Sequence, residues 1–179
     1  MTGPAKQPAA AVRIEPVTEA DVEAVAALAR EIWYAHYPAI ISTAQIEYML
    51  GQRYSLEVLR AELGQRDLWW DKLIVGGALA GFASYFLGSD AGDMKLDKLY
   101  VHPDHQRRGY GGMMIARAGE TAAARGRRRL VLAVNKGNRD AITAYLKQGF
   151  RIAEATVKDI GGGFVMDDYI MVKPVTSDQ

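Results

Sequence analysis

The sequence predicts a single mixed α/β domain in which a central, mixed but mostly antiparallel sheet of about seven strands carries helices on both faces. Two observations on the whole chain support this fold class. The 179 residues match the usual size of one domain, and an apolar content of 49% is enough to fill one core. Segments with helical periodicity come first, a meander of strands follows, and the chain then runs strand, helix, strand, helix and hairpin.

The N-terminal part is expected to form a tail, one strand and three helices. Residues 1–11, with prolines at positions 4 and 8, predict a disordered tail, so the domain itself spans residues 12–175. A short alternating strand is expected at Val12–Pro16. Apolar residues at helical spacing predict a first helix that runs to about Tyr34, and serine caps predict two further helical segments around Thr43–Leu50 and Ser55–Gln65.

Glycines divide the rest of the chain into strands and helices. Two strands flank Gly76 and Gly77 as an antiparallel hairpin, and the last two strands are joined by glycines at positions 161–163. Helices are expected at Gly109–Arg125 and Asn138–Gln148. The expected strands are Leu68–Val75, Leu79–Leu87, Lys95–Val101, Leu130–Val134, Phe150–Ile160 and Phe164–Lys173.

Composition excludes several classes of function. The 22 Lys and Arg against 21 Asp and Glu leave a net charge of +1, so no overall field draws the protein to nucleic acid or to an anionic membrane. A basic cluster at a helix end lacks interleaved aromatic residues and is interpreted as a solvated turn; it comprises Arg125, Arg127, Arg128 and Arg129. The absence of cysteine removes disulfides and thiolate chemistry. Without a signal peptide or a run of about 20 apolar residues, a cytoplasmic protein is expected.

The most informative segment runs from Leu99 to Gly112, where a strand leads through a turn and two arginines into glycines that open a helix. Glycine lets main-chain N–H groups approach an anion closely, and a helix N-terminus adds partial positive charge, so the segment predicts a phosphate cradle. It is not a nucleotide P-loop, because Met113 and Met114 follow the glycines in place of Lys and Ser or Thr. It is not a dinucleotide fingerprint, because the third glycine is misplaced and no acid follows the next strand.

The cradle resembles motif A of the GNAT superfamily of N-acetyltransferases, Gln/Arg-x-x-Gly-x-Gly/Ala, which this chain matches from Gln106 to Gly111 after a strand that ends Val-His-Pro. A second run is similar to the same family: after Asn135, the pattern Asn-x-x-Ala-x-x-x-Tyr-x-x-x-Gly-Phe begins at Asn138 and ends at Phe150. The resemblance covers roughly Gly76–Lys173. It implies a GNAT-like fold and acetyl-CoA as co-substrate, without a metal.

For acetyl-CoA, the resemblance implies contacts from the strand and from the loop. The strand residues Leu99, Tyr100 and Val101 would lie on the pantetheine arm, chiefly through the main chain of Leu99 and Val101. The loop would surround the pyrophosphate through Gln106, Arg107, Arg108, Gly109, Tyr110, Gly111 and Gly112. The alternative is a glycine turn that caps a core helix and carries solvated arginines.

The second run supplies a candidate acid. Tyr145 lies seven residues, or two helical turns, after Asn138, which is expected to cap the helix, so both side chains share one face. The resemblance implies that Tyr145 protonates or hydrogen-bonds the departing CoA thiolate, and that Asn135 and Asn138 contact pantetheine or position the helix. The alternatives are a packed aromatic side chain for Tyr145 and a turn-forming amide for Asn135.

The general base is the least defined part of the predicted site. Some family members carry Glu in the strand before the Asn, where this chain has Ala133, and others use Glu on the motif A strand, where this chain has Lys95. Asp97 is the candidate that remains, acting directly or through water. The alternative for Asp97 is an ion pair with Lys98 or Lys95.

The resemblance implies that the acceptor approaches over the first helices and the last hairpin. An aromatic cluster there could hold a cationic amine, with core packing as the alternative and the favoured one for Trp33. The candidate acceptor residues are Trp33, Tyr34, His36, Tyr37, Tyr48, Tyr54 and Asp97. The acidic pair Asp167 and Asp168 could attract a polyamine, and the chain is somewhat similar to bacterial polyamine acetyltransferases.

Together these inferences predict an N-acetyltransferase that moves an acetyl group from acetyl-CoA to a primary amine of a small molecule, a polyamine or a peptide N-terminus, by direct attack in a ternary complex. The rival is an acyl-CoA-binding sensor or regulatory module without turnover, which the missing acid at Ala133 keeps open. The resemblance also implies a homodimer. Neither nucleic acid nor a membrane is expected as a partner, and three scattered histidines do not predict a metal site.

Overall fold

The computed structural model describes residues 9–175, which form seven strands and five α-helices. The strands are β1 (Val12–Pro16), β2 (Leu68–Val75), β3 (Ala78–Leu87), β4 (Asp93–Val101), β5 (Arg129–Asn135), β6 (Arg151–Gly161) and β7 (Phe164–Pro174). The helices are α1 (Val22–His36), α2 (Thr43–Tyr54), α3 (Leu56–Leu63), α4 (Tyr110–Ala124) and α5 (Arg139–Lys147). Of the predicted tail, residues 1–8 lie outside the described residues, and residues 9–11 form neither helix nor strand.

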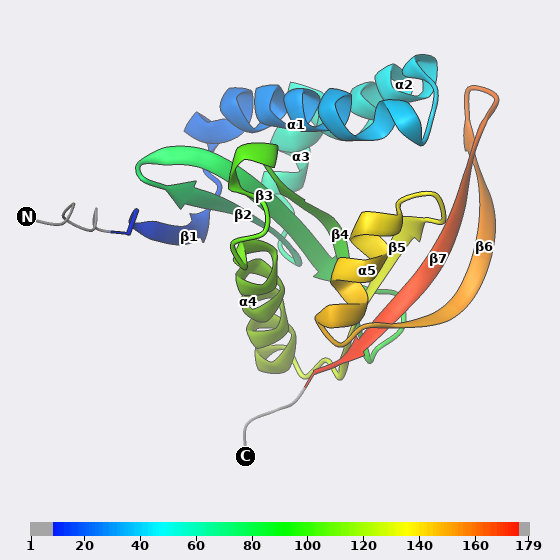
Figure 1. Cartoon of the computed structure of the whole chain (residues 1–179). Helices are drawn as coiled ribbons and strands as arrows, with labels where there is room; N and C mark the ends of the chain where they lie inside the picture. The colour runs from blue at the N-terminus through cyan, green and yellow to red at the C-terminus, as the bar shows by residue number, and fades with distance from the viewer. Residues whose placement is uncertain (1–8, 176–179) are drawn as a thin grey trace, which may run out of the picture.

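The strands form one sheet in the order β1-β2-β3-β4-β5-β7-β6, with helices on both faces (Figure 1). Every neighbouring pair is antiparallel except β4 and β5, which run parallel. The predicted mixed, mostly antiparallel sheet is therefore confirmed. The single parallel pair lies in the middle of the sheet, where the connection through α4 separates the N-terminal meander from the C-terminal hairpin.

One helix differs from its prediction in a way that affects the site. The second helix was expected to end at Leu50, before a glycine, but α2 continues to Tyr54. Gly51 costs the helix some stability, yet Tyr54 on the last turn is only 4% exposed, and burial of its ring outweighs that cost. The added turn carries Arg53 and Tyr54 into the protein.

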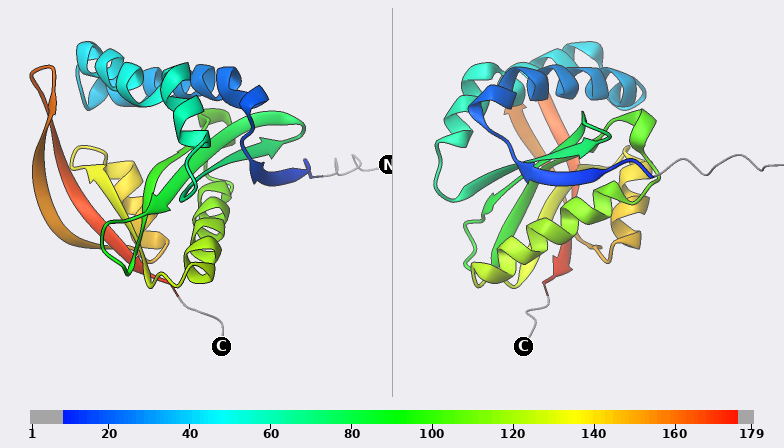
Figure 2. Two further views of the ribbon diagram at one scale, coloured as in Figure 1. Left: turned by 180° about the vertical axis from the view of Figure 1, so that it is seen from behind. Right: turned by 90° about the vertical axis from the view of Figure 1, so that its left-hand side faces the viewer.

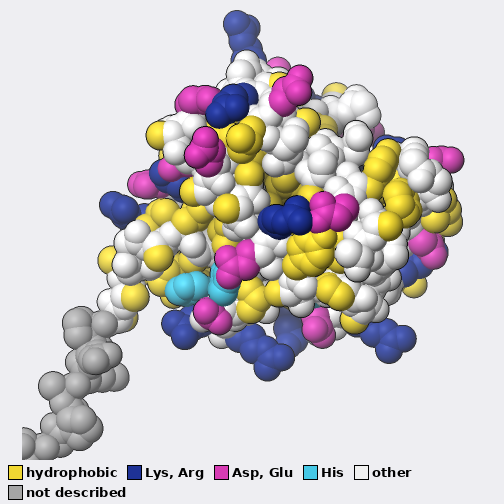
Figure 3. All heavy atoms as spheres, turned by 90° about the horizontal axis from the view of Figure 1, so that it is seen from above, with side chains coloured by type: hydrophobic (Ala, Val, Ile, Leu, Met, Phe, Trp, Pro, Cys, Tyr) yellow, Lys and Arg dark blue, Asp and Glu magenta, His cyan; other side chains and the backbone are white. Residues whose placement is uncertain are grey.

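The helices α1, α2 and α3 lie across one face of the sheet (Figures 1 and 2). Their core is built on Ile32, Ile46 and Leu59, each at most 2% exposed, together with Phe82 of the sheet. Aromatic side chains extend this core toward the middle of the sheet: Trp33, Tyr37, Tyr54 and Tyr100 belong to the same cluster. The face that α1 and α2 present to solvent carries charges of both signs (Figure 3).

The helices α4 and α5 cover the opposite face (Figure 2). In α4, Ala118 and Ala122 have no exposed surface and belong to one cluster with Leu130 of β5, because their small side chains let the helix lie close to the sheet. No side chain of α5 is fully buried, and its residues Ile142 and Tyr145 only partly join that cluster. A residue of α5 can thus contact both the core and a ligand.

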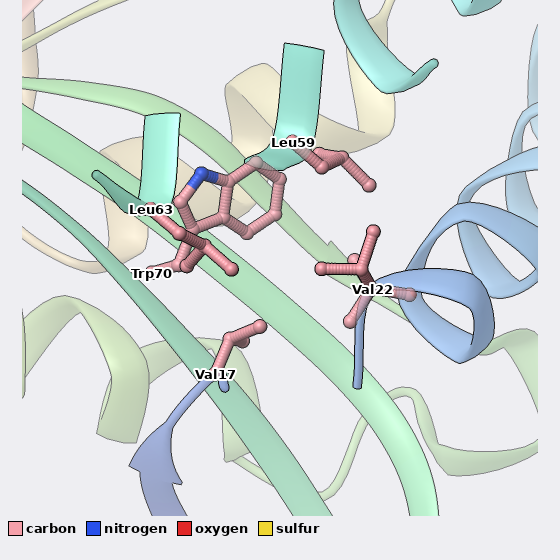
Figure 4. A pocket seen from close by; sticks show the side chains of 6 residues that line it. Val17, Val22, Leu59, Leu63 and Trp70 are labelled. Atoms are coloured by element: carbon pink, nitrogen blue, oxygen red, sulfur yellow. The ribbon is translucent and has the colours of Figure 1, made fainter. Parts of the chain in front are cut away.

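A small cavity beside α3 shows what a packing defect looks like in this protein (Figure 4). Its lining is apolar throughout: Val17, Val22, Val25, Leu59, Leu63 and Trp70. The one polar side-chain group there, Nε1 of Trp70, donates to Glu62 at 2.7 Å. This cavity offers a polar ligand nothing to bind. Within residues 9–175, no helix is both long and apolar enough to cross a membrane.

Candidate active site at the splay of strands β4 and β5

The strands β4 and β5 pair only at their beginnings. The paired residues are Asp93 with Arg129, Met94 with Leu130 and Lys95 with Val131. Beyond them β4 continues to Val101 and β5 to Asn135 without pairing to each other, and we call this divergent region the splay. A strand edge without a partner leaves main-chain N–H and C=O groups unpaired. The splay can therefore hydrogen-bond an extended ligand.

The residues of β4 whose main chain faces the splay are Leu99 and Val101. Alternate residues of a strand direct their main-chain groups to opposite neighbours. The N–H of His102 donates to β3 at 2.8 Å, so the main chain of Tyr100 also faces β3, while Leu99 and Val101 face the splay. The Tyr100 side chain turns toward α1, where its hydroxyl lies 2.8 Å from that of Tyr37. The geometry favours Leu99 and Val101 as cofactor contacts and does not support Tyr100.

The loop before α4 has the backbone of an anion site. Arg107 (φ 62°) and Gly109 (φ 83°) adopt left-handed conformations on either side of Arg108. Left-handed residues among right-handed ones turn successive N–H groups to one side, forming a concave anion nest. Among the described residues, no acceptor meets the main-chain N–H groups of residues 107–112. A non-glycine residue in this conformation costs about 1–3 kcal/mol, and such strain is typical of a functional loop.

The positive charges of the loop also lack an acidic partner among the described residues. The side chains of Arg107 and Arg108 are exposed, and neither takes part in an ion pair among residues 9–175. A Cβ added at Gly111 would meet no atom within 4 Å, so the protein itself leaves that side of the helix start open. Both observations fit a bound phosphate better than a turn that only caps a helix.

Two residues of the predicted cradle have packing roles. The side-chain Nε2 of Gln106 donates to the carbonyl of Val101 at 3.0 Å and ties the loop to the end of β4. A Cβ at Gly112 would come within 2.8 Å of the Gln148 amide, so this glycine lets the start of α4 lie against the end of α5. Nothing in the sequence pattern pointed to Gln148.

Tyr145 combines a packed ring with an unused hydroxyl. Its ring meets Phe150 edge-on, with centroids 5.5 Å apart, which fixes the side chain against the core. Its hydroxyl has no hydrogen-bond partner among the described residues, although the side chain is only partly exposed. Burial raises the pKa of Tyr145 above its ordinary value, and nearby Tyr37 acts in the same direction. The phenol therefore keeps its proton at neutral pH and can donate it.

The two asparagines of the second motif hold the end of β5 and the start of α5. Asn135 accepts the Gly137 N–H at 2.8 Å, which is the turn-forming role considered for it. Asn138 occupies the N-cap position, but its side chain does not cap the helix. Its Oδ1 lies instead 2.9 Å from Nε2 of His36 on α1. This contact joins the two helical layers across the splay, which the sequence did not reveal.

Asp97 lies in a bulge of β4 and is ion-paired. Ser84 pairs with Lys98 and Tyr85 with Leu96, so Asp97 has no partner residue on β3. Its carboxylate accepts from Arg53 at 3.0 Å and from Lys98 at 2.7 Å. Burial alone would raise the pKa of Asp97, but these two cations outweigh it and lower the pKa to about 2. So weak a base is disfavoured as the proton acceptor of the reaction.

The aromatic candidates for the acceptor site separate into two groups. Trp33 is 2% exposed and its ring centroid lies 4.3 Å from that of Tyr37, so it packs in the core. Tyr34 lies on the outer side of α1, where its hydroxyl donates to Glu47 and its ring lies under Arg30. Tyr37 is 9% exposed. It is close enough to Tyr145 to raise the pKa of that phenol, so of these three residues it is the one that lies near the splay.

The two acidic side chains of the pair on β7 lie on opposite faces of the sheet. Asp167 is exposed and bonds Lys136 at 2.7 Å. Asp168 is 4% exposed, and its Oδ1 is buried without a hydrogen-bond partner in the described part of the chain. Burial raises the pKa of Asp168, although Arg53 opposes this. A buried carboxylate that lacks a partner is uncommon and marks a candidate functional group.

The remaining candidates have ordinary partners. His102 lies 2.7 Å from Glu31, and the described residues contain no cluster of His, Cys, Asp and Glu that could hold a metal ion. In the basic cluster, Arg125 pairs with Asp67 at 3.4 Å and Arg129 with Asp93 at 2.5 Å.

Comparison with known proteins agrees with this geometry. Residues 23–150 match the model of the acetyltransferase (GNAT) family. The spermidine N(1)-acetyltransferase of Thermoplasma acidophilum is 26% identical over 160 residues, which cover 87% of this chain and 96% of that protein.

Two solved structures share the fold over nearly their whole length. The PaiA N-acetyltransferase of Thermoplasma acidophilum, solved in complex with coenzyme A, superposes with a TM-score of 0.78 at 24% identity and covers 92% of this chain and 99% of its own. A GCN5-related N-acetyltransferase of Rhodopseudomonas palustris superposes with a TM-score of 0.77 at 22% identity and covers 95% and 99%. At these identities the superpositions establish the fold.

Proposed function

This chain belongs to the GNAT family of acetyltransferases, and on that premise we propose that it transfers the acetyl group of acetyl-CoA to a primary amine by direct attack in a ternary complex. The observation that carries the proposal is the splay: within residues 9–175, strand groups without a strand partner, an anion nest and a phenol without a hydrogen-bond partner lie around one break in the sheet. The chemistry needs all three, because a thioester, a diphosphate and a leaving thiolate must each be held.

The chain's own residues suit acetyl-CoA. Leu99 and Val101 offer main-chain groups to the amides of the pantetheine arm. The N–H groups of residues 107–112 and the side chains of Arg107 and Arg108 offer donors and positive charge to the pyrophosphate. Apart from the Val101 carbonyl, which accepts from Gln106 at 3.0 Å, each of these groups lacks a protein partner among residues 9–175, as expected for a site that is completed by its ligand.

Tyr145 is the proposed acid. When the C–S bond breaks, the sulfur leaves as a thiolate, and a protonated phenol next to it can donate a proton. Because burial raises the pKa of Tyr145, the phenol is protonated at the pH at which the enzyme works. The ring contact with Phe150 fixes the direction of the hydroxyl, which is what proton transfer requires.

A cationic amine is the acceptor class we favour, with a polyamine as the first member to test. The relative that is 26% identical carries the name spermidine N(1)-acetyltransferase. Buried Asp168 adds a negative group near the splay. Small monoamines and peptide N-termini share the ammonium group and remain in the proposal.

The test is calorimetry with acetyl-CoA followed by a thiol-release assay over polyamines, amino acids, aminoglycosides and peptide N-termini. We expect acetyl-CoA to bind and CoA to be released with one class of amine. Gly109→Ala should weaken acetyl-CoA binding, because alanine resists the φ of 83° in the nest. Binding without release on any amine would favour the sensor, and no binding would contradict the cofactor site.

The proposal includes a single domain over residues 12–175 that acts as a cytoplasmic homodimer. The edge strand β6 supports an interface between copies, because Val157 is 65% and Ile152 43% exposed there. Size-exclusion chromatography with light scattering measures the mass of the protein directly. A monomer at assay concentration would contradict the proposed dimer.

A further inference from the structure

We propose that the carboxylate of Asp168 on β7 binds the ammonium group of the acceptor and takes its proton, so that β7, and not the motif A strand, supplies the general base. The inference rests on the proposed amine acetylation and assigns to Asp168 the role of base for which the sequence offered Asp97.

The first argument is the state of the side chain. Asp168 is 4% exposed, and Oδ1 is buried without a hydrogen-bond partner. Leaving a carboxylate oxygen in this state costs stability unless something else meets it. No polar group among residues 9–175 does so. A ligand that brings N–H donors would satisfy it.

The second argument is that every cation near Asp168 is engaged elsewhere. Arg53 lies on α2 and lowers the pKa of Asp168, but its hydrogen bond goes to Asp97. Lys136 pairs with Asp167 at 2.7 Å. Lys95 of β4 acts on Asp168 only at longer range, and its Nζ lies 5.8 Å from the centre of the Phe86 ring. These cations therefore lower the pKa of Asp168 without filling its hydrogen bonds, and burial together with Asp167 raises that pKa by more.

The third argument is position. Asp168 pairs with Asn135, the last residue of β5, beside the open end of the splay. Ala133, two residues earlier on β5, lies on the same face as Asp168 because alternate strand residues share a face. Its small side chain is exposed, so that face is uncovered next to the carboxylate. Tyr37 of α1 is close enough to feel the charge of Asp168, and it also acts on Tyr145. Base and acid thus face one region.

The fourth argument is basicity. Burial raises the pKa of Asp168 above its ordinary value, whereas Arg53 and Lys98 hold that of Asp97 at about 2. When two carboxylates near one site are pushed apart in this way, the more basic one is suited to accept a proton. The charged groups that set its titration are Arg53 of α2, Lys95 of β4, Lys136 after β5 and Asp167 of β7, with Tyr37 of α1 facing it.

The proton balance closes with the groups present. One proton of the ammonium passes to Asp168, and the nitrogen lone pair attacks the thioester carbon. The C–S bond breaks, sulfur keeps the electron pair, and it takes the proton of Tyr145. The second proton lost from the attacking nitrogen returns to the Tyr145 oxygen through solvent. The products are the amide, the CoA thiol and a proton on Asp168 that is released to water.

The test compares Asp168→Asn with wild-type protein and with the control Asp167→Asn. Asn keeps the shape of the side chain but cannot take a proton. We expect kcat/KM for the amine to fall about 10²–10⁴-fold in Asp168→Asn. The dissociation constant of acetyl-CoA, measured by calorimetry, should be unchanged, which also shows that the variant is folded. Asp167 lies on the other face and bonds Lys136, but its charge raises the pKa of Asp168. Asp167→Asn should therefore stay within about threefold of wild-type activity on the pH plateau and shift the limb assigned to Asp168 to lower pH.

The pH profile separates a base from a structural role. In wild-type protein, kcat/KM rises as Asp168 loses its proton and then levels off, while in Asp168→Asn it should keep rising toward the amine's own pKa, so the gap closes at high pH. An equal deficit at every pH, or activity within about threefold of wild type at neutral pH, overturns the assignment. If wild-type protein itself turns over no amine, the proposed function fails and Asp168 with it. Failure of Asp168 alone appears as an active wild type and an active variant.

Discussion

Two carboxylates near the splay, one on each side of it, differ in nearly every respect. Asp97 on β4 is held by Arg53 and Lys98 and is a weak base with a pKa of about 2. Asp168 on β7 is 4% exposed, has no hydrogen-bond partner among residues 9–175, and has a raised pKa. The two share Arg53, which donates to Asp97 alone.

The difference shows how one arginine, by donating to one of two nearby carboxylates, can give that carboxylate a structural role and leave the other available for chemistry. Hydrogen bonds satisfy Asp97, so its charge strengthens the contact between α2 and the bulge of β4. The buried Oδ1 of Asp168 has no donor among residues 9–175, so a ligand with N–H groups can bind it. In the proposed reaction, the cost of burying this unpaired carboxylate is what makes Asp168 basic enough to take a proton. The pairing pattern, more than the residue type, decides which acid is the functional one.

Breaking the Arg53 contact should have the largest effect on stability. Arg53→Met leaves Asp97 with Lys98 alone and removes the hydrogen bonds to the Asp97 carbonyl and carboxylate. We expect a loss of about 3 kcal/mol in the free energy of unfolding, measured by urea denaturation. Arg30→Met removes an exposed pair with Glu47 and should cost less than about 1 kcal/mol. Equal losses in the two variants would contradict the special role of Arg53.

Removing the acid sharpens the comparison by leaving both carboxylates in place. Tyr145→Phe keeps the ring contact with Phe150 and deletes the hydroxyl. We expect kcat to fall about 10²-fold, with the affinity for acetyl-CoA and the pH limb assigned to Asp168 both retained. An unchanged kcat would show that Tyr145 only packs.

Neutralising Asp97 should cost stability in a pH-dependent way. Its pKa is lowered from 3.8 to about 2 in the folded protein, so its contribution is present above pH 4 and is lost as the pH falls toward 2. At neutral pH we expect Asp97→Asn to lose about 2 kcal/mol in the free energy of unfolding. The two proteins should converge near pH 2, and a constant difference down to that pH would refute the assigned cause.

Neutralising Asp168 should have the opposite sign and the smallest size. A raised folded pKa means that the charged form destabilises the fold, and this penalty grows as the pH rises through that pKa. At neutral pH, Asp168→Asn should therefore increase the free energy of unfolding by about 0.5–1 kcal/mol and so raise the melting temperature, although it abolishes most activity. A lower melting temperature would indicate that the carboxylate has a partner after all.

The sequence predicted the elements well where local signals are strong. The glycine turn after Val75 and the aromatic and β-branched content of Leu68–Val75 predicted that strand with its observed bounds, because turn chemistry and strand propensity act locally. The end of α2 was missed because burial of Tyr54 depends on the sheet below it. Likewise, the cradle at Gly109 was evident from spacing, whereas the positive φ of Arg107 was not.

The choice between acids could not be made from the sequence. Alternation along a strand says that Asp167 and Asp168 face opposite ways, but which of them is buried depends on what packs on each face. The bulge that turns Asp97 toward Arg53 leaves no local pattern either. Partners such as the one between His36 and Asn138 join residues 102 positions apart, beyond any local signal.

Acetylation of an amine is tested most directly by identifying the product. Wild-type protein is incubated with acetyl-CoA and a mixture of spermidine, a monoamine, an amino acid and a short peptide, and the amines are then analysed by mass spectrometry alongside the CoA thiol released. We expect one amine class to gain a single acetyl group in amounts equal to the thiol, with spermidine the first candidate. Bound acetyl-CoA with neither acetylated amine nor free thiol would contradict the proposed enzyme and point to the sensor.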